Sequence, residues 1–152
     1  MALARTQGVK PGSVAGAHKI RIPDAVVTST AASTKDFQFT QPAGTIIEDI
    51  YVHVVDAITL SSGSATSDVT VSIGTATTYD GVQLAASTTL IDYSASTTEA
   101  AGTVTKITPT ATYSGTVAQD ETTFYGQVKL GAAATVTTTG GVIEIHIIYR
   151  HF

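Results

Sequence analysis

The stretch TIIEDIYVHVVDAITL, residues Thr45–Leu60, is the longest strand-like run of the chain and decides the fold class. Successive side chains of a strand point to opposite faces. Strict alternation therefore predicts a largely aliphatic face with Ile46, Ile50, Val52 and Val54. The opposite face is mixed and carries Ile47, Asp49, Tyr51, His53 and Val55. This pattern predicts a strand with one side on a core and the other against a partner, a second layer or water.

A second run of the same kind closes the chain. In VIEIHIIYRHF, residues 142–152, one face carries Ile143, Ile145, Ile147 and Tyr149, and the other carries Glu144, His146, Ile148 and Arg150. We expect this strand to lie in a sheet beside the run 45–60, because both have one strongly apolar face to bury.

Several shorter segments show the same period of two between turn-forming residues. They are residues 35–40, 68–73 and 122–130, with weaker candidates at 20–27, around 104–113 and at 135–139. The run 45–60 and the segment 68–73 are separated by a short Gly/Ser loop, which predicts a hairpin or meander. Residues 82–91 fit either a strand or a short helical turn. No convincing amphipathic helix occurs, so the sequence predicts an all-β fold, an antiparallel β-sandwich or jelly roll of about eight strands with an extended N-terminal arm.

Aspartates recur every twelve residues, at Asp56, Asp68, Asp80 and Asp92. A stacked repeat would give this spacing, but the apolar positions of the four segments do not repeat with it. We therefore favour successive strand-and-turn units of similar length over a solenoid.

Composition limits the function classes. The 152 residues suffice for one domain with its own core, and the absence of cysteine excludes disulfides, thiolate metal sites and cysteine nucleophiles. Only 13% of residues are charged, against 28 threonines and 12 serines, which favour strands and turns. The surface is therefore expected to be polar but weakly charged.

The net charge of −4 hides an uneven distribution. Residues 1–21 carry four basic side chains and no acid, which leaves four basic and twelve acidic side chains, or −8, on residues 22–152. We predict a flexible basic arm over residues 1–18 and a β-sandwich domain over residues 19–152. The start lacks the apolar core of a signal peptide and no segment is apolar enough to span a bilayer, so we expect a protein made in the cytoplasm without a membrane partner.

No catalytic signature occurs, since GxSxG, HExxH, GxGxxG and GxxxxGK[ST] are all missing from the sequence. If the two long strands pair, His53 and His146 could approach each other and form a metal site with Glu48, Asp49 or Glu144. Nothing in their spacing enforces convergence, however. We therefore expect no metal, no cofactor and no catalytic residue, and interpret the histidines as partly exposed strand residues or as part of a subunit interface.

The flexible basic start, the stretch TIIEDIYVHVVDAITLSSGSATSDVTVSIGTATTYDG, the Ala/Thr/Ser/Gly-rich loops and the closing VIEIHIIYRHF resemble the capsid decoration (cement) proteins of tailed bacteriophages. The resemblance covers most of the chain but is one of style and rests on no signature motif. It implies a non-enzymatic jelly-roll body that assembles as a homotrimer on the outer capsid surface of the virion. The implied partner is the major capsid protein.

By analogy with that family, the arm residues contact the shell: Arg5, Lys10, Lys19 and Arg21. Aromatic and histidine side chains of the two long strands would form the subunit interface: Tyr51, His53, His146 and Tyr149. Four basic residues on an acidic body argue against nucleic acid as a partner.

Two other classes remain. A carbohydrate-binding or adhesion module of a phage head or tail fibre would need an exposed aromatic platform, and the chain has no Trp and six scattered Tyr. A β-sandwich hydrolase would need a nucleophile or metal signature that the sequence lacks.

Overall fold

The structure is a computed structural model. It describes residues 14–23, 33–62, 68–75, 85–92, 97–107, 117–131, 135–136 and 141–151. These residues form strands and connections and include no helix, so the predicted all-β class is confirmed. The strands are β1 (Val14–Pro23), β2 (Ser33–Gln41), β3 (Thr45–Asp56), β4 (Ile58–Ser62), β5 (Val69–Gly74), β6 (Ala85–Ile91), β7 (Thr98–Glu99), β8 (Val104–Ile107), β9 (Thr122–Leu130), β10 (Thr135–Val136) and β11 (Val142–His151).

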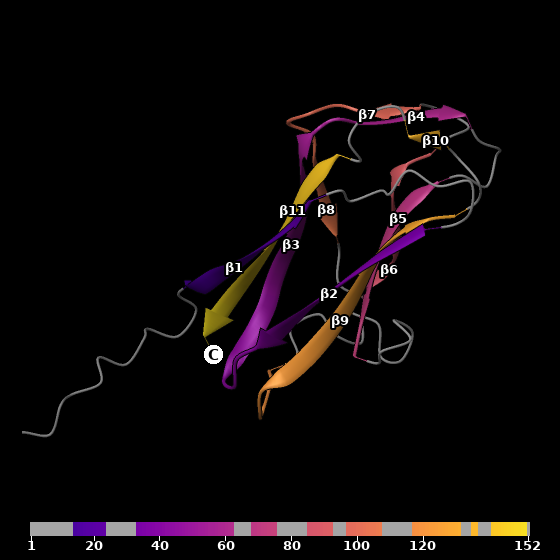
Figure 1. The fold of residues 1–152 in the computed structure, drawn as a ribbon. Coiled ribbons are helices and arrows are strands. Elements are labelled where there is room, and N and C mark those ends of the chain that lie inside the picture. The colour runs from indigo at the N-terminus through magenta and orange to yellow at the C-terminus, as the bar shows by residue number, and fades with distance from the viewer. Residues whose placement is uncertain are drawn as a thin grey trace, which may run out of the picture.

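The strands form three antiparallel sheets. Two have four strands, in the orders β1-β11-β3-β8 and β2-β9-β5-β6, and a small third sheet has the order β10-β4-β7. Figure 1 shows the two four-stranded sheets side by side and the small sheet across one end of both. Side chains from both large sheets belong to one hydrophobic cluster, so their inner faces pack against each other around a shared core.

The two long runs of the sequence pair as expected. β3 lies beside β11 from Thr45↔His151 to Asp56↔Val142, which places both in the middle of their sheet. Ile143, Ile145 and Ile147 are fully buried, and Ile50 and Val52 lie on the same inner face. The alternation predicted for the closing run is therefore confirmed.

The alternation predicted for the start of β3 is wrong at one point. Ile47, expected on the mixed face, is buried, whereas Ile46, expected on the aliphatic face, is only partly buried. The register explains this, because Ile148 pairs with Asp49 but Tyr149 pairs with Ile47. Glu48 is thus an extra residue, a β-bulge that reverses the faces of the residues before it.

The second large sheet contributes the aromatic part of the core. Phe39 on β2 and Phe124 on β9 are cross-strand partners whose rings stack with centroids 5.1 Å apart. The predicted strands at 35–40, 68–73 and 122–130 correspond to β2, β5 and β9. The segment 82–91, left open between strand and helical turn, contains the strand β6.

The predicted hairpin between the runs 45–60 and 68–73 is wrong. The first run divides after Asp56 into β3 and β4, and β5 pairs with β6 and β9 in the opposite sheet. Gly141 packs against the start of β4, just after the point where the first run divides. Its φ is +69°, and it lies so close to the side chain of Ile58 that a Cβ could not fit there.

The first described strand begins within the segment that was predicted to be a flexible arm. Residues 14–18, assigned to the arm, belong to β1, which pairs with β11 along its whole length and forms a sheet edge. Its apolar residue Ile22 reaches the core, and this burial holds the strand on the sheet. Residues 1–13 lie outside the described residues. Pairing between strands as distant as β1 and β11 also excludes the solenoid, in which each repeat contacts only its neighbours.

Candidate functional site

The outward face of the sheet β1-β11-β3-β8 gathers most of the polar residues that the sequence singles out. Cross-strand partners of an antiparallel sheet project from the same face, so the strand register orders them in rows. One row is Arg21, Glu144, His53 and Val104, and the next is Lys19, His146, Tyr51 and Lys106. The regular pairing of four strands thus brings residues from both ends and the middle of the chain to one place.

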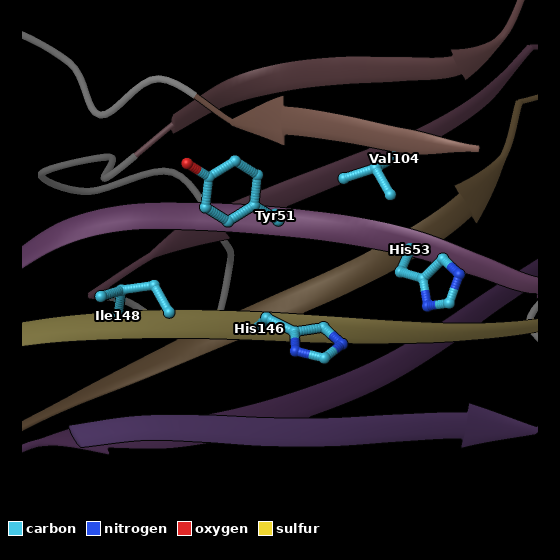
Figure 2. A pocket seen from close by; sticks show the side chains of 5 residues that line it. All are labelled: Tyr51, His53, Val104, His146 and Ile148. Carbon is cyan, nitrogen blue, oxygen red and sulfur yellow. The ribbon is translucent and has the colours of Figure 1, made fainter. Parts of the chain in front are cut away.

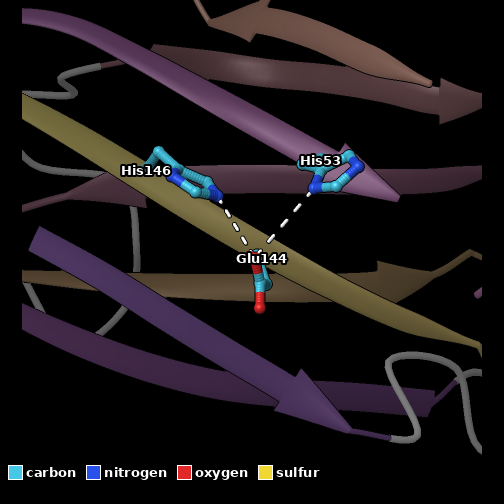
Figure 3. Close-up of side chains that lie close together, drawn as sticks. All are labelled: His53, Glu144 and His146. Carbon is cyan, nitrogen blue, oxygen red and sulfur yellow. Dashed lines mark ion pairs between the residues drawn. The ribbon is translucent and has the colours of Figure 1, made fainter. Parts of the chain in front are cut away.

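Glu144 lies at the centre of this face and is largely buried, with 8% of its surface exposed. Its Oε1 accepts a hydrogen bond from Arg21 Nη1 at 3.1 Å and lies 3.4 Å from Lys19 Nζ. Its Oε2 lies 3.4 Å from His146 Nε2 and 4.0 Å from His53 Nδ1. Figure 3 shows both imidazoles directed at this second oxygen.

Two opposing effects act on the pKa of Glu144. Burial of the carboxyl group raises it, but hydrogen bonds from Arg21 and Lys19 lower it, and the net result is a pKa below its ordinary value. The carboxylate is therefore ionised at neutral pH.

A surface hollow of about 290 Å³ adjoins the histidines. Figure 2 shows its lining from three neighbouring strands: Tyr51, His53, Val104, His146 and Ile148. Val104 is 58% exposed, the only large hydrophobic side chain among the described residues with that degree of exposure. The face therefore combines an ionic cluster with a small apolar depression.

Tyr51 is held in place at this hollow. Its hydroxyl donates a hydrogen bond to Asp49 Oδ2 at 3.1 Å, and Lys106 Nζ lies 5.7 Å from the centre of its ring. Lys106 is also paired with Asp49, and that hydrogen bond raises the pKa of the lysine despite the opposing effect of burial. A second ion pair, Arg150 with Glu48, lies further along the strands.

Three of the four residues predicted for an oligomer interface, namely Tyr51, His53 and His146, meet on this outward face. Tyr149 does not, and its assignment to an interface is wrong. It follows Ile145 and Ile147 on the inner face, is 5% exposed, and its hydroxyl donates a hydrogen bond to the Thr40 carbonyl oxygen at 3.2 Å. Burial raises its pKa to about 12.

The predicted shell-contact residues are also divided. Lys19 and Arg21 lie on β1 rather than on an arm, and both form ion pairs with Glu144. Arg5 and Lys10 lie outside the described residues. Of the three carboxylates considered as partners for the histidines, the strand register selects Glu144, because it is the direct partner of His53 on β11.

The sequence reasoning missed Val104 and Ile148. Neither stands out by residue type, and both acquire their place only through pairing between strands distant in sequence.

No family model matches the chain, and no curated protein matches it. Among the residues that the structure describes, no helix could cross a membrane.

Proposed function

We propose that the chain is a jelly-roll protein of a tailed-phage virion that binds the assembled capsid as a decoration protein. The observation that carries the proposal is the strand order. When the small sheet β10-β4-β7 is left out, eight strands remain among the described residues, and numbered along the chain they have the orders 1-8-3-6 and 2-7-4-5. The pairs 1-8, 2-7, 3-6 and 4-5 are those expected when a long antiparallel ribbon is rolled into two sheets, and this agreement supports the proposed jelly roll.

Jelly rolls are typical of viral capsid and lectin domains, so the fold supports a binding role without specifying the partner. Three further features favour a shell. The chain has few charges and many threonines, its first 21 residues are basic while the remainder carries −8, and an apolar hollow lies on the outward face of one sheet.

In the proposed assembly, the outward face with Tyr51, His53 and His146 contacts a second copy of the chain, and the segment before β1 contacts the major capsid protein through Arg5 and Lys10. Three copies then bind together, so that weak contacts combine by effective concentration. β1 begins at Val14 opposite Arg150, which fixes where this segment joins the sheet.

The test is co-sedimentation of the purified chain with shells assembled from the major capsid protein of the same virus, and in parallel with unassembled capsid subunits. We expect binding to shells alone. In the double variant Arg5→Ala/Lys10→Ala, three copies lose two ionic contacts each, which predicts a weakening on the order of tenfold to a hundredfold.

The matched control is Lys35→Ala/Lys129→Ala, which removes two cations from β2 and β9 on the other sheet. It should bind like the unmodified chain. Equal binding to shells and subunits, or equal binding by both double variants, would contradict the proposal.

A second candidate is a carbohydrate-binding module on a phage head or tail fibre. The observation that favours it is Tyr51, whose ring lines the hollow and is oriented by Asp49 and Lys106. Sugar rings stack on such aromatic faces. A glycan array in which Tyr51→Ala abolishes a specific signal would support this candidate over the shell.

A further inference from the structure

We propose that His53, Glu144 and His146 form a binding site for a divalent transition metal of the zinc class. The three side chains each offer one ligand atom, and these atoms lie within 4.8 Å of one another. The inference is independent of the shell proposal, because it rests on the geometry of one chain.

The backbone positions these ligands. His53 and Glu144 are direct cross-strand partners on β3 and β11, and His146 follows Glu144 by two residues on the same face of β11. Both strands lie in the interior of the four-stranded sheet, and their inner faces are fully buried in the core. Ligands on rigid neighbouring strands keep their arrangement better than ligands on loops.

The distances suit tetrahedral coordination after small side-chain rotations. With metal–ligand distances of about 2.1 Å, two ligand atoms of a tetrahedron lie roughly 3.4 Å apart. His146 Nε2 and Glu144 Oε2 are already at 3.4 Å, and His53 Nδ1 is 4.0 Å from the same oxygen. The imidazole rings are tilted by 56° with centroids 6.3 Å apart, so they approach the carboxylate from different directions.

A separate observation comes from His146. Its Nε2 atom is buried and forms no hydrogen bond of the usual geometry, although Glu144 Oε2 lies 3.4 Å away. A weakly paired buried nitrogen is unfavourable, and a metal ion bound by both groups would satisfy it. This is the atom that faces Glu144 in Figure 3.

The two cations beside Glu144 orient its carboxylate for metal binding. Lys19 and Arg21 both bind Oε1, which leaves Oε2 directed at the histidines. Hydrogen bonds to the second oxygen of a ligating carboxylate orient it and keep it ionised, which is the usual outer shell of a metal site. The two cations also repel a metal, but their side chains are 57% and 54% exposed, so solvent weakens this repulsion.

The types of the three ligands indicate which metal ions could bind. Two imidazoles and one carboxylate are a known set for zinc sites that keep a fourth position open, and imidazole also suits Cu²⁺ and Ni²⁺. Carboxylate-rich sites for Ca²⁺ or Mg²⁺ need more oxygen ligands than this cluster offers. Three protein ligands leave room for a water molecule or a donor from a bound partner.

The test is isothermal titration of the full, tag-free chain with ZnCl₂ at neutral pH, together with thermal unfolding. We expect one ion per chain. At a hundredfold excess over Kd, zinc should raise Tm by roughly 5–10 °C. His53→Gln, Glu144→Gln and His146→Gln should each weaken binding at least tenfold, and Co²⁺ should give the visible absorption of a tetrahedral site.

The matched controls are His18→Gln and His151→Gln, which remove the two histidines outside the cluster and should leave the affinity unchanged. Because Glu144→Gln also frees two cations, the urea midpoint of each variant without metal establishes that it is folded. Histidine side-chain nitrogen resonances in the unmodified chain provide a second readout, with the largest shifts expected at His53 and His146. Zinc binding that persists in both cluster histidine variants, or no binding at millimolar zinc, would overturn the proposal.

Discussion

Among the glycines that the structure describes, Gly126 has the least room for an added methyl group. It lies on β9 as the direct partner of Phe37 on β2, and the Phe37 ring covers the place where a Cβ would be. An alanine Cβ would overlap Cζ and Cε2 of the ring and lie 2.6 Å from Cε1. Because Phe37 is only 9% exposed and part of the core, its ring cannot move aside without losing packing.

The change in the free energy of unfolding caused by Gly126→Ala is the sum of two opposing effects. Replacing glycine with alanine in a strand ordinarily stabilises by roughly 0.5–1 kcal/mol, while overpacking a core destabilises by about 1–3 kcal/mol. The difference between the two effects is about 0–2.5 kcal/mol, so we expect Gly126→Ala to lower the free energy of unfolding by up to about 2.5 kcal/mol. When Phe37→Ala has removed the ring, the same change should stabilise by roughly 0.5–1 kcal/mol, so the coupling between the two positions equals the overpacking cost of about 1–3 kcal/mol.

The assay is urea unfolding of the four members of this double-mutant cycle, followed by far-ultraviolet circular dichroism. The matched control repeats Gly126→Ala in a Phe39→Ala background, where a ring that stacks on Phe124 is lost but Phe37 remains. There the full destabilisation should persist. If the effect of Gly126→Ala is the same with and without Phe37, the ring is not its cause and the prediction is wrong.

Three other predictions follow from the fold. Tyr149→Phe should remove a tyrosine ionisation near pH 12 in an ultraviolet pH titration, because burial raises the pKa of Tyr149 from 10.0 to about 12. The folded state holds this proton more tightly, so stability should fall as pH rises from about 10 to 12, and it should fall less in the variant. Ile145→Ala, at a fully buried position, should lower the free energy of unfolding measured in urea by about 2–5 kcal/mol. Ile148 is only half-buried, so Ile148→Ala should lower it by much less. Equal losses would contradict the assigned faces of β11. Deleting Glu48 should leave a chain that is folded by circular dichroism, because the deletion removes the bulge and leaves the inward-facing residues of β3 on the inner face. Deleting Tyr51 should abolish folding, because it moves the residues on one side of the deletion to the opposite face. A folded Tyr51 deletion and an unfolded Glu48 deletion would place the bulge elsewhere.

The sequence predicted the elements whose pattern is local. The alternation of β11 and of the later part of β3 follows from period-two apolar positions, and their pairing follows because both bury one face. The bulge at Glu48 could not be predicted, since Ile46 and Ile47 are equally apolar and only the register with Tyr149 decides which one faces inward.

The site shows the same division. His53 and His146 stood out by residue type, and Glu144 was one of three candidate carboxylates. Its selection depends on cross-strand register between residues 91 positions apart in the chain, which no local pattern encodes. Tyr149 was misassigned to an interface although its own alternation with Ile145 and Ile147 already places it in the core.

The most direct test of the proposed function is electron cryo-microscopy of shells incubated with the purified chain. We expect ordered density for a two-sheet β domain on the outer surface, in groups of three at the junctions between capsomers. The sheet β1-β11-β3-β8 should turn its outward face toward a neighbouring copy. Bare shells at saturating protein, or density confined to tails or fibres, would contradict it.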